Sequence, residues 1–210
     1  MSNDTTANVI IVISAPSGTG KTTLINALLE RSEKLKFSVS YTTRPPREGE
    51  LNGKDYFFVS EKTFKEMIEQ NEFVEWVENF GWFYGTARRY IEEVLKDGFD
   101  LLIDVETWGA KKIKEAYPEA GLVFILPPSW DELKTRVLRR GVRDEEEINR
   151  RFAKAKEEIK EILWYDYIII NDKFTEAFEQ LWAVYQAEKL KLFRMTQKIE
   201  KIMESFQGGY

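Results

Sequence analysis

The residues best suited to chemistry lie near the N-terminus, in the run from Ser14 to Thr23. Gly18 and Gly20 let the chain turn tightly, so that successive backbone N–H groups point at one anion. Lys21 adds a positive charge that reaches the outer phosphates, and the hydroxyl of Thr22 is placed for Mg²⁺. This spacing of glycines, lysine and threonine predicts a phosphate-binding P-loop that holds a nucleoside triphosphate.

The elements on either side must position this loop. Residues 9–13 are a β-branched run typical of a strand buried in a parallel sheet, and residues 21–29 place apolar side chains on one face of a helix. The alternative, a chance glycine-rich turn with a surface lysine, is disfavoured by these flanks. The general pattern opens with glycine where this chain has Ala15, but no phosphate-contacting group is lost. The expected triphosphate contacts are Ala15, Pro16, Ser17, Gly18, Thr19, Gly20, Lys21, Thr22 and Thr23.

The composition narrows the classes of function. The chain has 210 residues, a net charge of −5, and neither cysteine nor histidine. Disulfides, thiolate zinc sites and Ser–His or Cys–His nucleophile systems are therefore excluded, so catalysis must rest on other polar side chains and a bound ion. The acidic balance predicts no nucleic-acid partner. Without a leader-like start or an apolar run of span length, we expect no membrane partner and a cytoplasmic protein.

Strands and helices alternate through most of the chain. Buried strands are expected at residues 9–13, 99–104, 122–126 and 166–170, with helices at 88–96, 107–117, 130–140 and 144–164. This alternation predicts an α/β fold with three layers around a parallel sheet, which binds ligands at the carboxyl ends of its strands.

Two segments depart from this alternation. Residues 37–87 contain short strands at 37–41, 54–59, 73–77 and 81–86 and a helix at 61–70 that Ser60 caps, which predicts a small β-rich insertion. In the tail, apolar residues repeat at intervals of three and four, namely Leu192, Met195, Ile199, Ile202 and Phe206. We expect this tail helix to pack back on the core, with a dimer contact as the alternative.

Several blocks of sequence, in this order, resemble the guanylate kinase family. Besides the P-loop they are residues 40–49, 53–56, 75–76, 84–86, 102–104, 127–129, 139–141 and 170–172, with Arg136 and Arg151. The resemblance runs from residue 9 to about residue 185 and is more specific than a P-loop alone. It implies a P-loop NTPase fold and the reaction ATP + GMP → ADP + GDP, with Mg²⁺ as cofactor and dGMP as a further acceptor.

The same resemblance divides the chain into parts. It implies one guanylate-kinase-like domain over about residues 7–187, with a core of residues 1–36, 88–128 and 152–210 that includes the helical tail. Residues 37–87 would bind GMP, and residues 129–151 would form a short helical lid. The implied partners are the small molecules ATP and GMP, bound by a monomer or a homodimer.

A phosphate acceptor suits a chain without histidine, because it is already ionised near neutral pH and needs no base. Arg44 and Arg47 lie in a loop stiffened by prolines, and guanidinium groups contact phosphate bidentately. The resemblance assigns the GMP phosphate to these arginines together with Tyr56 and Tyr84. The alternative is a solvated arginine loop beside two half-buried tyrosines.

Glu75 is the candidate for recognising the base. One carboxylate can accept from the adjacent N1–H and N2–H₂ donors of guanine, a pair that adenine lacks. The resemblance places Ser40 and Thr86 beside the base as hydroxyl donors. Taken alone, Glu75 is more typical of a surface glutamate on an edge strand, and only its block, residues 73–76, favours base recognition.

The chain departs from the family pattern after the strand that ends at Asp104. The family has Asp-x-Asp followed by x-Gln-Gly, whereas this chain has Asp104, Glu106 and then Trp108. Asp104 is expected on the acceptor side of the core, where it would orient Mg²⁺-bound water or the acceptor-side arginines. Glu106 keeps its charge there with a longer reach, and Trp108 replaces an amide by a ring that can stack.

Arginines of the predicted lid complete the site. Arg136 and Arg140 share one face of a helix, and Arg151 comes from the next helix. With Lys21 and Arg44, the resemblance makes them catalytic cations that stabilise charge during transfer; a solvated, salt-bridged surface is the alternative. Asn171, just past the last strand, is expected on the adenine side.

Two other functions stay open at this point. Guanylate-kinase-like domains of scaffold proteins hold phosphorylated peptides with the same arginines and tyrosines and do not catalyse. A related P-loop kinase would act on another phosphorylated acceptor. Retention of Lys21, Thr22 and the lid arginines favours an enzyme over a binding module, and Glu75 with Thr86 argues against the other acceptor.

Overall fold

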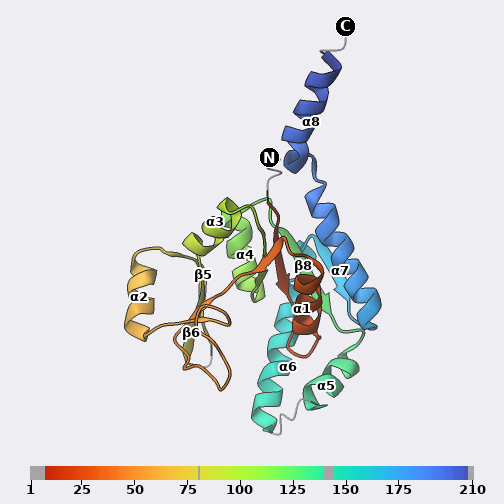
Figure 1. The fold of residues 1–210 in the computed structure, drawn as a ribbon. Helices are drawn as coiled ribbons and strands as arrows, with labels where there is room; N and C mark the ends of the chain where they lie inside the picture. Colours follow the sequence, from red (N-terminus) through yellow and green to blue (C-terminus); the bar gives the residue numbers. More distant parts are fainter. Residues whose placement is uncertain (1–7, 80, 140–143, 208–210) are drawn as a thin grey trace.

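The computed structural model describes residues 8–79, 81–139 and 144–207 of the chain. Its centre is a five-stranded sheet with the order β2-β7-β1-β8-β9, in which all neighbours are parallel (Figure 1). The strands are β1 Ile10–Ser14, β2 Leu35–Phe37, β7 Asp100–Asp104, β8 Gly121–Leu126 and β9 Tyr167–Ile170. Because β1 lies in the middle, the loop that follows it opens at the centre of the carboxyl edge.

Helices cover both faces of this sheet because the side chains of β1 alternate between two cores. Ile11 and Ile13 pack with side chains of α1 and α7, and Ile10 and Val12 pack with side chains of α3 and α4. These helices are α1 Lys21–Arg31, α7 Phe174–Lys189, α3 Arg88–Lys96 and α4 Thr107–Ala116. The predicted three-layer α/β fold is confirmed.

A second sheet, with the order β4-β3-β6-β5, is built from residues 41–87. Its elements are β3 Tyr41–Thr42, β4 Phe57–Phe58, helix α2 Glu61–Glu69, β5 Phe73–Asn79 and β6 Trp82–Ala87. The predicted cap of α2 is present, since Ser60 Oγ accepts from the backbone N–H of Thr63 at 3.0 Å. Phe64 and Phe73 stack in a core of their own, and β5 contacts α4. This sheet therefore adjoins the carboxyl edge of the central sheet.

Two helices follow β8 and lead back to the central sheet. They are α5 Trp130–Arg139 and α6 Glu145–Lys160, and a 3₁₀ turn, Ile162–Trp164, precedes β9. Ser129 caps α5 as predicted, because its Oγ accepts from the backbone N–H of Glu132 at 3.1 Å. Leu133 and Val137 of α5 pack on Ala155 of α6, which fixes the two helices to each other.

Three strand predictions are wrong in detail. The strand predicted at residues 37–41 is two strands in different sheets, because β2 ends at Phe37 and β3 begins at Tyr41. The strand predicted at 54–59 is reduced to β4. The last strand is predicted to be buried, but β9 lies at the edge of the sheet, and its Ile168 and Ile170 are exposed. A β-branched run indicates a strand but not its place in a sheet.

The last helix, α8 Leu192–Gln207, extends away from the body of the molecule (Figure 1). Its first turn is anchored by the buried Arg194, which donates to the carbonyl of Glu119 at 2.9 Å. Leu192 and Phe206 are 74% and 77% exposed, and residues 201–206 are all exposed. The prediction that the tail packs back on the core is therefore wrong, and the apolar stripe is a face that the single chain leaves exposed.

Candidate active site

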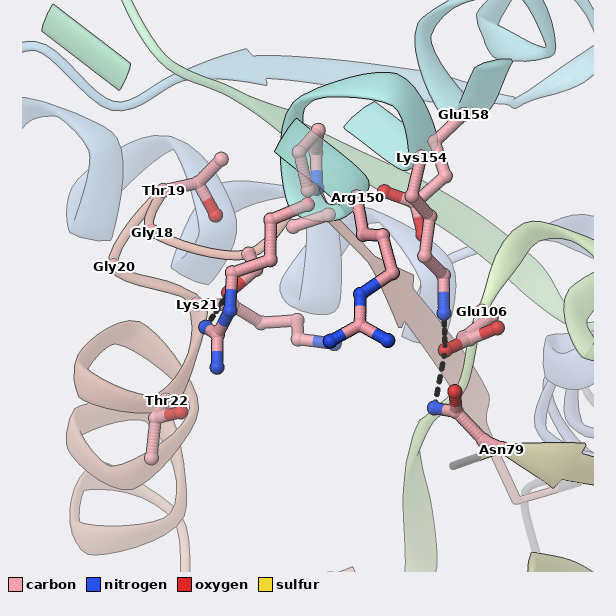
Figure 2. A pocket seen from close by; sticks show the side chains of 14 residues that line it. Gly18, Thr19, Gly20, Lys21, Thr22, Asn79, Glu106, Arg150, Lys154 and Glu158 are labelled. Carbon is pink, nitrogen blue, oxygen red and sulfur yellow. Dashed lines mark hydrogen bonds and ion pairs between the residues drawn. The ribbon is translucent and has the colours of Figure 1, made fainter. Parts of the chain in front are cut away.

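Two neighbouring cavities open at the carboxyl edge of the central sheet. The first, of about 520 Å³, lies between the P-loop and α6 (Figure 2). It is lined by residues 15–22 of the loop, by Arg150, Arg151, Lys154 and Glu158 of α6, and by Asn79 and Glu106. The predicted triphosphate contacts from Ala15 to Thr22 therefore line one cavity. Thr23 is exposed on α1 and lies outside this lining.

Two glycines give the P-loop its shape. Gly18 and Gly20 have φ angles of 99° and 90°, in the left-handed region that favours glycine. A side chain at Gly20 would place its Cβ 2.6 Å from Nδ2 of Asn171, so the loop also needs glycine for space. Among the described residues other than glycine, only Asn71 has a positive φ. Ala15 therefore sits in the P-loop without the backbone strain that would require glycine.

The loop is supported from behind by Asn171 and Arg136. Nδ2 of Asn171, just after β9, donates to the carbonyl of Thr19 at 2.6 Å. Arg136 of α5 donates to the carbonyl of Asn171 at 2.9 Å and to that of Thr19 at 3.4 Å. Both residues position the P-loop, and neither is part of the lining of the first cavity. The contact of Asn171 with adenine and the contact of Arg136 with phosphate both remain predictions.

Positive charge reaches the first cavity from two elements. Lys21 forms an ion pair with Asp104, which ends β7. Arg151 of α6 donates to Oγ of Ser17 at 3.1 Å and is paired with Glu147 one turn earlier. Predicted cations from the P-loop and from α6 thus border the same space. Arg140, which was predicted to join them, lies outside the described residues.

The second cavity, of about 320 Å³, lies between the second sheet and the start of α4. Of the predicted acceptor residues, it brings together Ser40, Tyr56, Glu75, Tyr84, Asp104 and Glu106. Lys21, Asn79 and Glu106 line both cavities. A ligand in one cavity would therefore adjoin a ligand in the other across this shared wall.

Glu75 is the buried carboxylate of the second cavity, only 6% exposed. Its Oε1 accepts from Oγ1 of Thr86 at 2.6 Å, and a Cβ at Gly109 would lie 2.9 Å from its Oε2. Burial raises the pKa of Glu75 to about 7, although the hydrogen bond from Thr86 opposes that shift. A carboxylate in such a desolvated place binds strongly to a ligand that supplies paired N–H donors.

Arg44 and Arg47 are not part of the lining of the second cavity, although Arg44 adjoins Tyr56 of that lining. The guanidinium of Arg44 is 5.5 Å from the ring centre of Tyr56 and donates to both carboxylate oxygens of Glu50, at 2.8 and 2.9 Å. This hydrogen bonding lowers the pKa of Glu50. Arg47 is exposed, and its backbone N–H also donates to Glu50. Glu50 therefore takes up Nη2 of a guanidinium that the family resemblance assigns to a phosphate.

Trp108, a departure from the family pattern, borders the second cavity. It is 51% exposed near the start of α4, and Nζ of Lys112 lies 5.8 Å from its ring centre. The ring therefore borders the ligand space at the place where the family pattern has an amide, and stacking on a ligand stays a prediction.

The sequence patterns do not single out three further lining residues, Asn79, Lys154 and Glu158. Asn79 lies four positions after Glu75 on β5, and the side-chain period of two puts both on one face. Lys154 and Glu158 follow Arg151 at helical spacings on α6. These spacings can be seen in the sequence. They indicate a functional site only after Glu75 and Arg151 have been identified as functional residues.

Similar proteins match this chain over nearly its whole length. A family model described as guanylate kinase matches residues 7–188. The chain is 49% identical to a guanylate kinase of Syntrophus aciditrophicus over 195 residues, which are 93% of this chain and 94% of that protein. It is 44% identical to a guanylate kinase of Caldanaerobacter subterraneus over 196 residues, 93% and 95% of the two chains.

A solved structure is similar as well. The crystal structure of guanylate kinase from Anaplasma phagocytophilum matches this fold with a TM-score of 0.73 at 34% sequence identity, over 90% of each chain. Residues 7–188, which the family model matches, include the central sheet, the second sheet and the residues that line both cavities.

Proposed function

The chain belongs to the guanylate kinase family, and from this premise we propose that it transfers the γ-phosphoryl group of ATP to GMP. The enzyme class predicted from the sequence, a nucleoside monophosphate kinase, is confirmed by this membership. ATP and GMP become ADP and GDP, and dGMP, with the same base and phosphate, is a second acceptor. One observation carries the proposal, namely the wall of Lys21, Asn79 and Glu106 that the two cavities share.

We assign ATP to the first cavity. The N–H groups of the P-loop and the start of α1 suit its phosphates, and Lys21 can turn from Asp104 to the outer oxygens. Arg151, with Arg136 and Arg140, neutralises the charge that moves during transfer. A phosphate oxygen of GMP approaches the γ-phosphorus of ATP from across the shared wall, in line with the bond that breaks. Holding the two nucleotides in this position supplies most of the catalysis.

Mg²⁺ fits the residues at the start of α1. Thr22 is part of the lining of the first cavity. The neighbouring residue, Lys21, forms an ion pair with the carboxylate of Asp104. One hydroxyl and one carboxylate beside phosphate oxygens and water form the donor set that Mg²⁺ takes with nucleotides. Thr22, and Asp104 through water, would hold the ion. When bound there it neutralises charge on the phosphates.

We assign GMP to the second cavity. Glu75 accepts from N1–H and N2–H₂ of guanine, and the remaining base and phosphate contacts are Ser40, Thr86, Asp104, Glu106, Arg44, Arg47, Tyr56 and Tyr84. Binding would replace Glu50 by the GMP phosphate at Arg44, so one anion exchanges for another. Adenine lacks the paired donors and would leave Glu75 buried without a partner on the ligand.

The division of the chain follows from these assignments. We propose residues 37–87 as the acceptor unit and residues 129–151 as a lid, which close on the core around both substrates and exclude water. We place the protein in the cytoplasm, as a monomer or a homodimer. Within residues 8–79, 81–139 and 144–207, no helix has the length and apolar character needed to cross a bilayer.

Steady-state ADP formation tests the proposal, with ATP·Mg²⁺ and each of GMP, dGMP, AMP, CMP and UMP as acceptor. We expect turnover with GMP and dGMP alone, and its loss in Lys21→Ala. Absence of turnover with every acceptor, while calorimetry still detects GMP binding, would overturn the kinase in favour of a non-catalytic binding module. A preference for AMP would overturn the role of Glu75.

A further inference from the structure

One carboxylate oxygen joins three elements at the boundary between the cavities. Oε1 of Glu106, between β7 and α4, accepts from Nδ2 of Asn79 at 3.3 Å and forms an ion pair with Nζ of Lys154 (Figure 2). Asn79 ends β5 in the second sheet, and Lys154 lies on α6. The second sheet, the core and α6 therefore meet at a single atom of the shared wall.

The contacts with Asn79 and Lys154 restrict the Glu106 side chain, which is long and partly exposed and would otherwise move among several rotamers. Its side chain is 40% exposed, and glutamate has one more rotatable bond than the aspartate of the family pattern. A carboxylate that moves among several rotamers must be ordered when a ligand uses it, and this ordering weakens binding. Both contacts use Oε1 and neither uses Oε2, so they fix the carboxylate and keep one oxygen for a ligand.

The ammonium of Lys154 also interacts with a second carboxylate, that of Glu158. Glu158 lies one turn further along α6, lines the first cavity with Lys154 and is half-buried. Burial raises the pKa of Glu158 to about 7, and the charge of Glu106 raises it further while Lys154 opposes the shift. Lys154 thus acts between two carboxylates. Without its ammonium, Glu106 would lose its ion pair and keep only the hydrogen bond from Asn79.

We propose that Lys154 is a positioning residue of the acceptor site, which fixes Glu106 so that the second cavity is preorganised for GMP. It also makes that cavity depend on α6, the helix that carries Arg151. The inference rests on the proposed function, because it takes GMP as the ligand of the second cavity. Lys154 acts through Glu106, so its loss weakens GMP binding by a larger factor than it changes the KM for ATP, although Lys154 also lines the first cavity.

Calorimetry of GMP binding and steady-state kinetics test this in the full chain. We expect Lys154→Met to raise the Kd and KM for GMP by roughly threefold to fivefold, the range that a partly exposed ion pair supplies. Lys154→Arg, which keeps the charge, should restore most of the affinity. Lys156→Met is the matched control, because Lys156 lies on the same helix with its ammonium 5.3 Å from the ring centre of Trp130. This control substitution should leave the Kd and KM for GMP and the KM for ATP unchanged.

A double variant separates a role through Glu106 from an independent one. If Lys154 acts through Glu106, the Glu106→Gln, Lys154→Met protein binds GMP about as weakly as Glu106→Gln alone. Additive losses, an unchanged GMP Kd in Lys154→Met, or a rise in the KM for ATP alone would each overturn the inference.

The two proposals fail in different ways. A wild-type protein that binds GMP without phosphorylating it overturns the proposed function, while the calorimetric arm still decides the role of Lys154. Normal turnover of GMP by the wild type, together with unchanged binding by Lys154→Met, overturns this inference alone. A wild type that does not bind GMP overturns both.

Discussion

At the scale of single residues, Glu75 combines two opposing requirements. It must be charged to accept from two N–H donors, yet its burial favours the neutral acid and raises its pKa to about 7. Thr86 already donates to Oε1, and Gly109 leaves just enough space beside Oε2. The carboxylate is therefore held in place before a base arrives, and a guanine supplies the donors that make its charged form favourable.

This conflict predicts a pH dependence of GMP binding. The folded-state pKa of this acid is raised, so Glu75 gains a proton as the pH falls through about 7, and the protonated acid no longer accepts with both oxygens. The Kd for GMP should therefore rise as the pH is lowered below about 7 and stay nearly constant above about 8, measured by calorimetry.

The GMP phosphate has its own second pKa near 6, so a matched control is needed. Glu75→Gln binds GMP more weakly at every pH and should show only the contribution of the phosphate. Identical pH profiles for the two proteins would contradict the assignment of Glu75.

At the scale of elements, the sequence predicts the features that are determined by residues close together in the chain. The P-loop, the caps at Ser60 and Ser129 and most helices depend on neighbouring residues, and the structure has them at the expected places. The place of a strand in a sheet depends on distant partners. The split of residues 37–41 between two sheets and the edge position of β9 therefore could not be predicted from an apolar run.

The candidate site follows the same division. The spacing of glycines, lysine and threonine identifies the P-loop part of the first cavity, and the family blocks identify much of the second through Tyr56, Glu75 and Tyr84. Lys154 on a charged helix has no distinctive neighbours, and only its contact with Glu106 gives it a role. Nor could the sequence indicate that Glu50 would accept both hydrogen bonds from Nη2 of Arg44.

The exposed end of α8 gives a prediction about an element. Removal of residues from 200 onward should leave kcat and both KM values unchanged, because residues 201–206 are exposed and α8 extends away from the cavities (Figure 1). Light scattering on the same protein reports whether the apolar stripe joins two copies. A fall in kcat of the truncated protein at unchanged molar mass would contradict this separation of tail and site.

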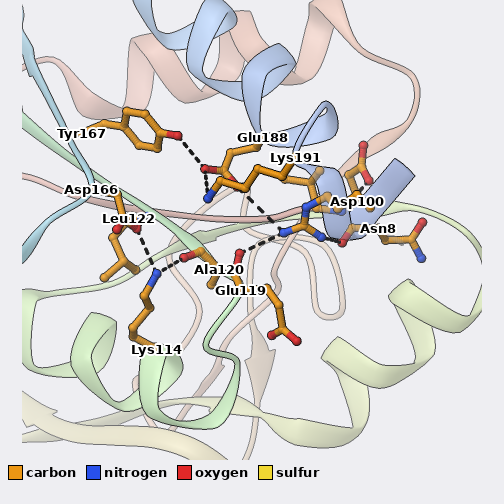
Figure 3. Close-up of polar contacts among 12 residues, drawn as sticks. Asn8, Asp100, Lys114, Glu119, Ala120, Leu122, Asp166, Tyr167, Glu188 and Lys191 are labelled. Atoms are coloured by element: carbon orange, nitrogen blue, oxygen red, sulfur yellow. Dashed lines mark hydrogen bonds and ion pairs between the residues drawn. The ribbon is translucent and has the colours of Figure 1, made fainter. Parts of the chain in front are cut away.

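At the scale of the whole molecule, a second polar network lies at the edge of the sheet opposite the cavities. Glu188 of α7 is fully buried, accepts from the hydroxyl of Tyr167 at 2.7 Å and pairs with Lys191 at 2.7 Å (Figure 3). Arg194 donates to the carbonyls of Asn8 and Glu119 from the start of α8. The network fastens Asn8 and the start of α8 to the starts of the central strands.

This arrangement predicts a variant that changes stability alone. Arg194→Ala should lower the free energy of unfolding by roughly 3 kcal/mol, the cost of breaking a buried charged contact, and lower the Tm accordingly. At temperatures where the variant is folded, its kcat/KM should equal that of the wild type. Arg89→Ala, which removes an exposed pair with Glu93, is the control and should leave the Tm nearly unchanged. A Tm for Arg194→Ala equal to that of the control would contradict a stabilising role for the network.

The central claim is that ATP and GMP meet across the wall that the two cavities share, with Lys21 as one of its residues. Transfer of label from [γ-³²P]ATP in the presence of Mg²⁺ and GMP tests it most directly. The account predicts that the wild type places the label in GDP, and that Lys21→Ala loses this transfer while GMP still binds. Label recovered only as inorganic phosphate, or remaining in ATP while both nucleotides bind, would contradict it.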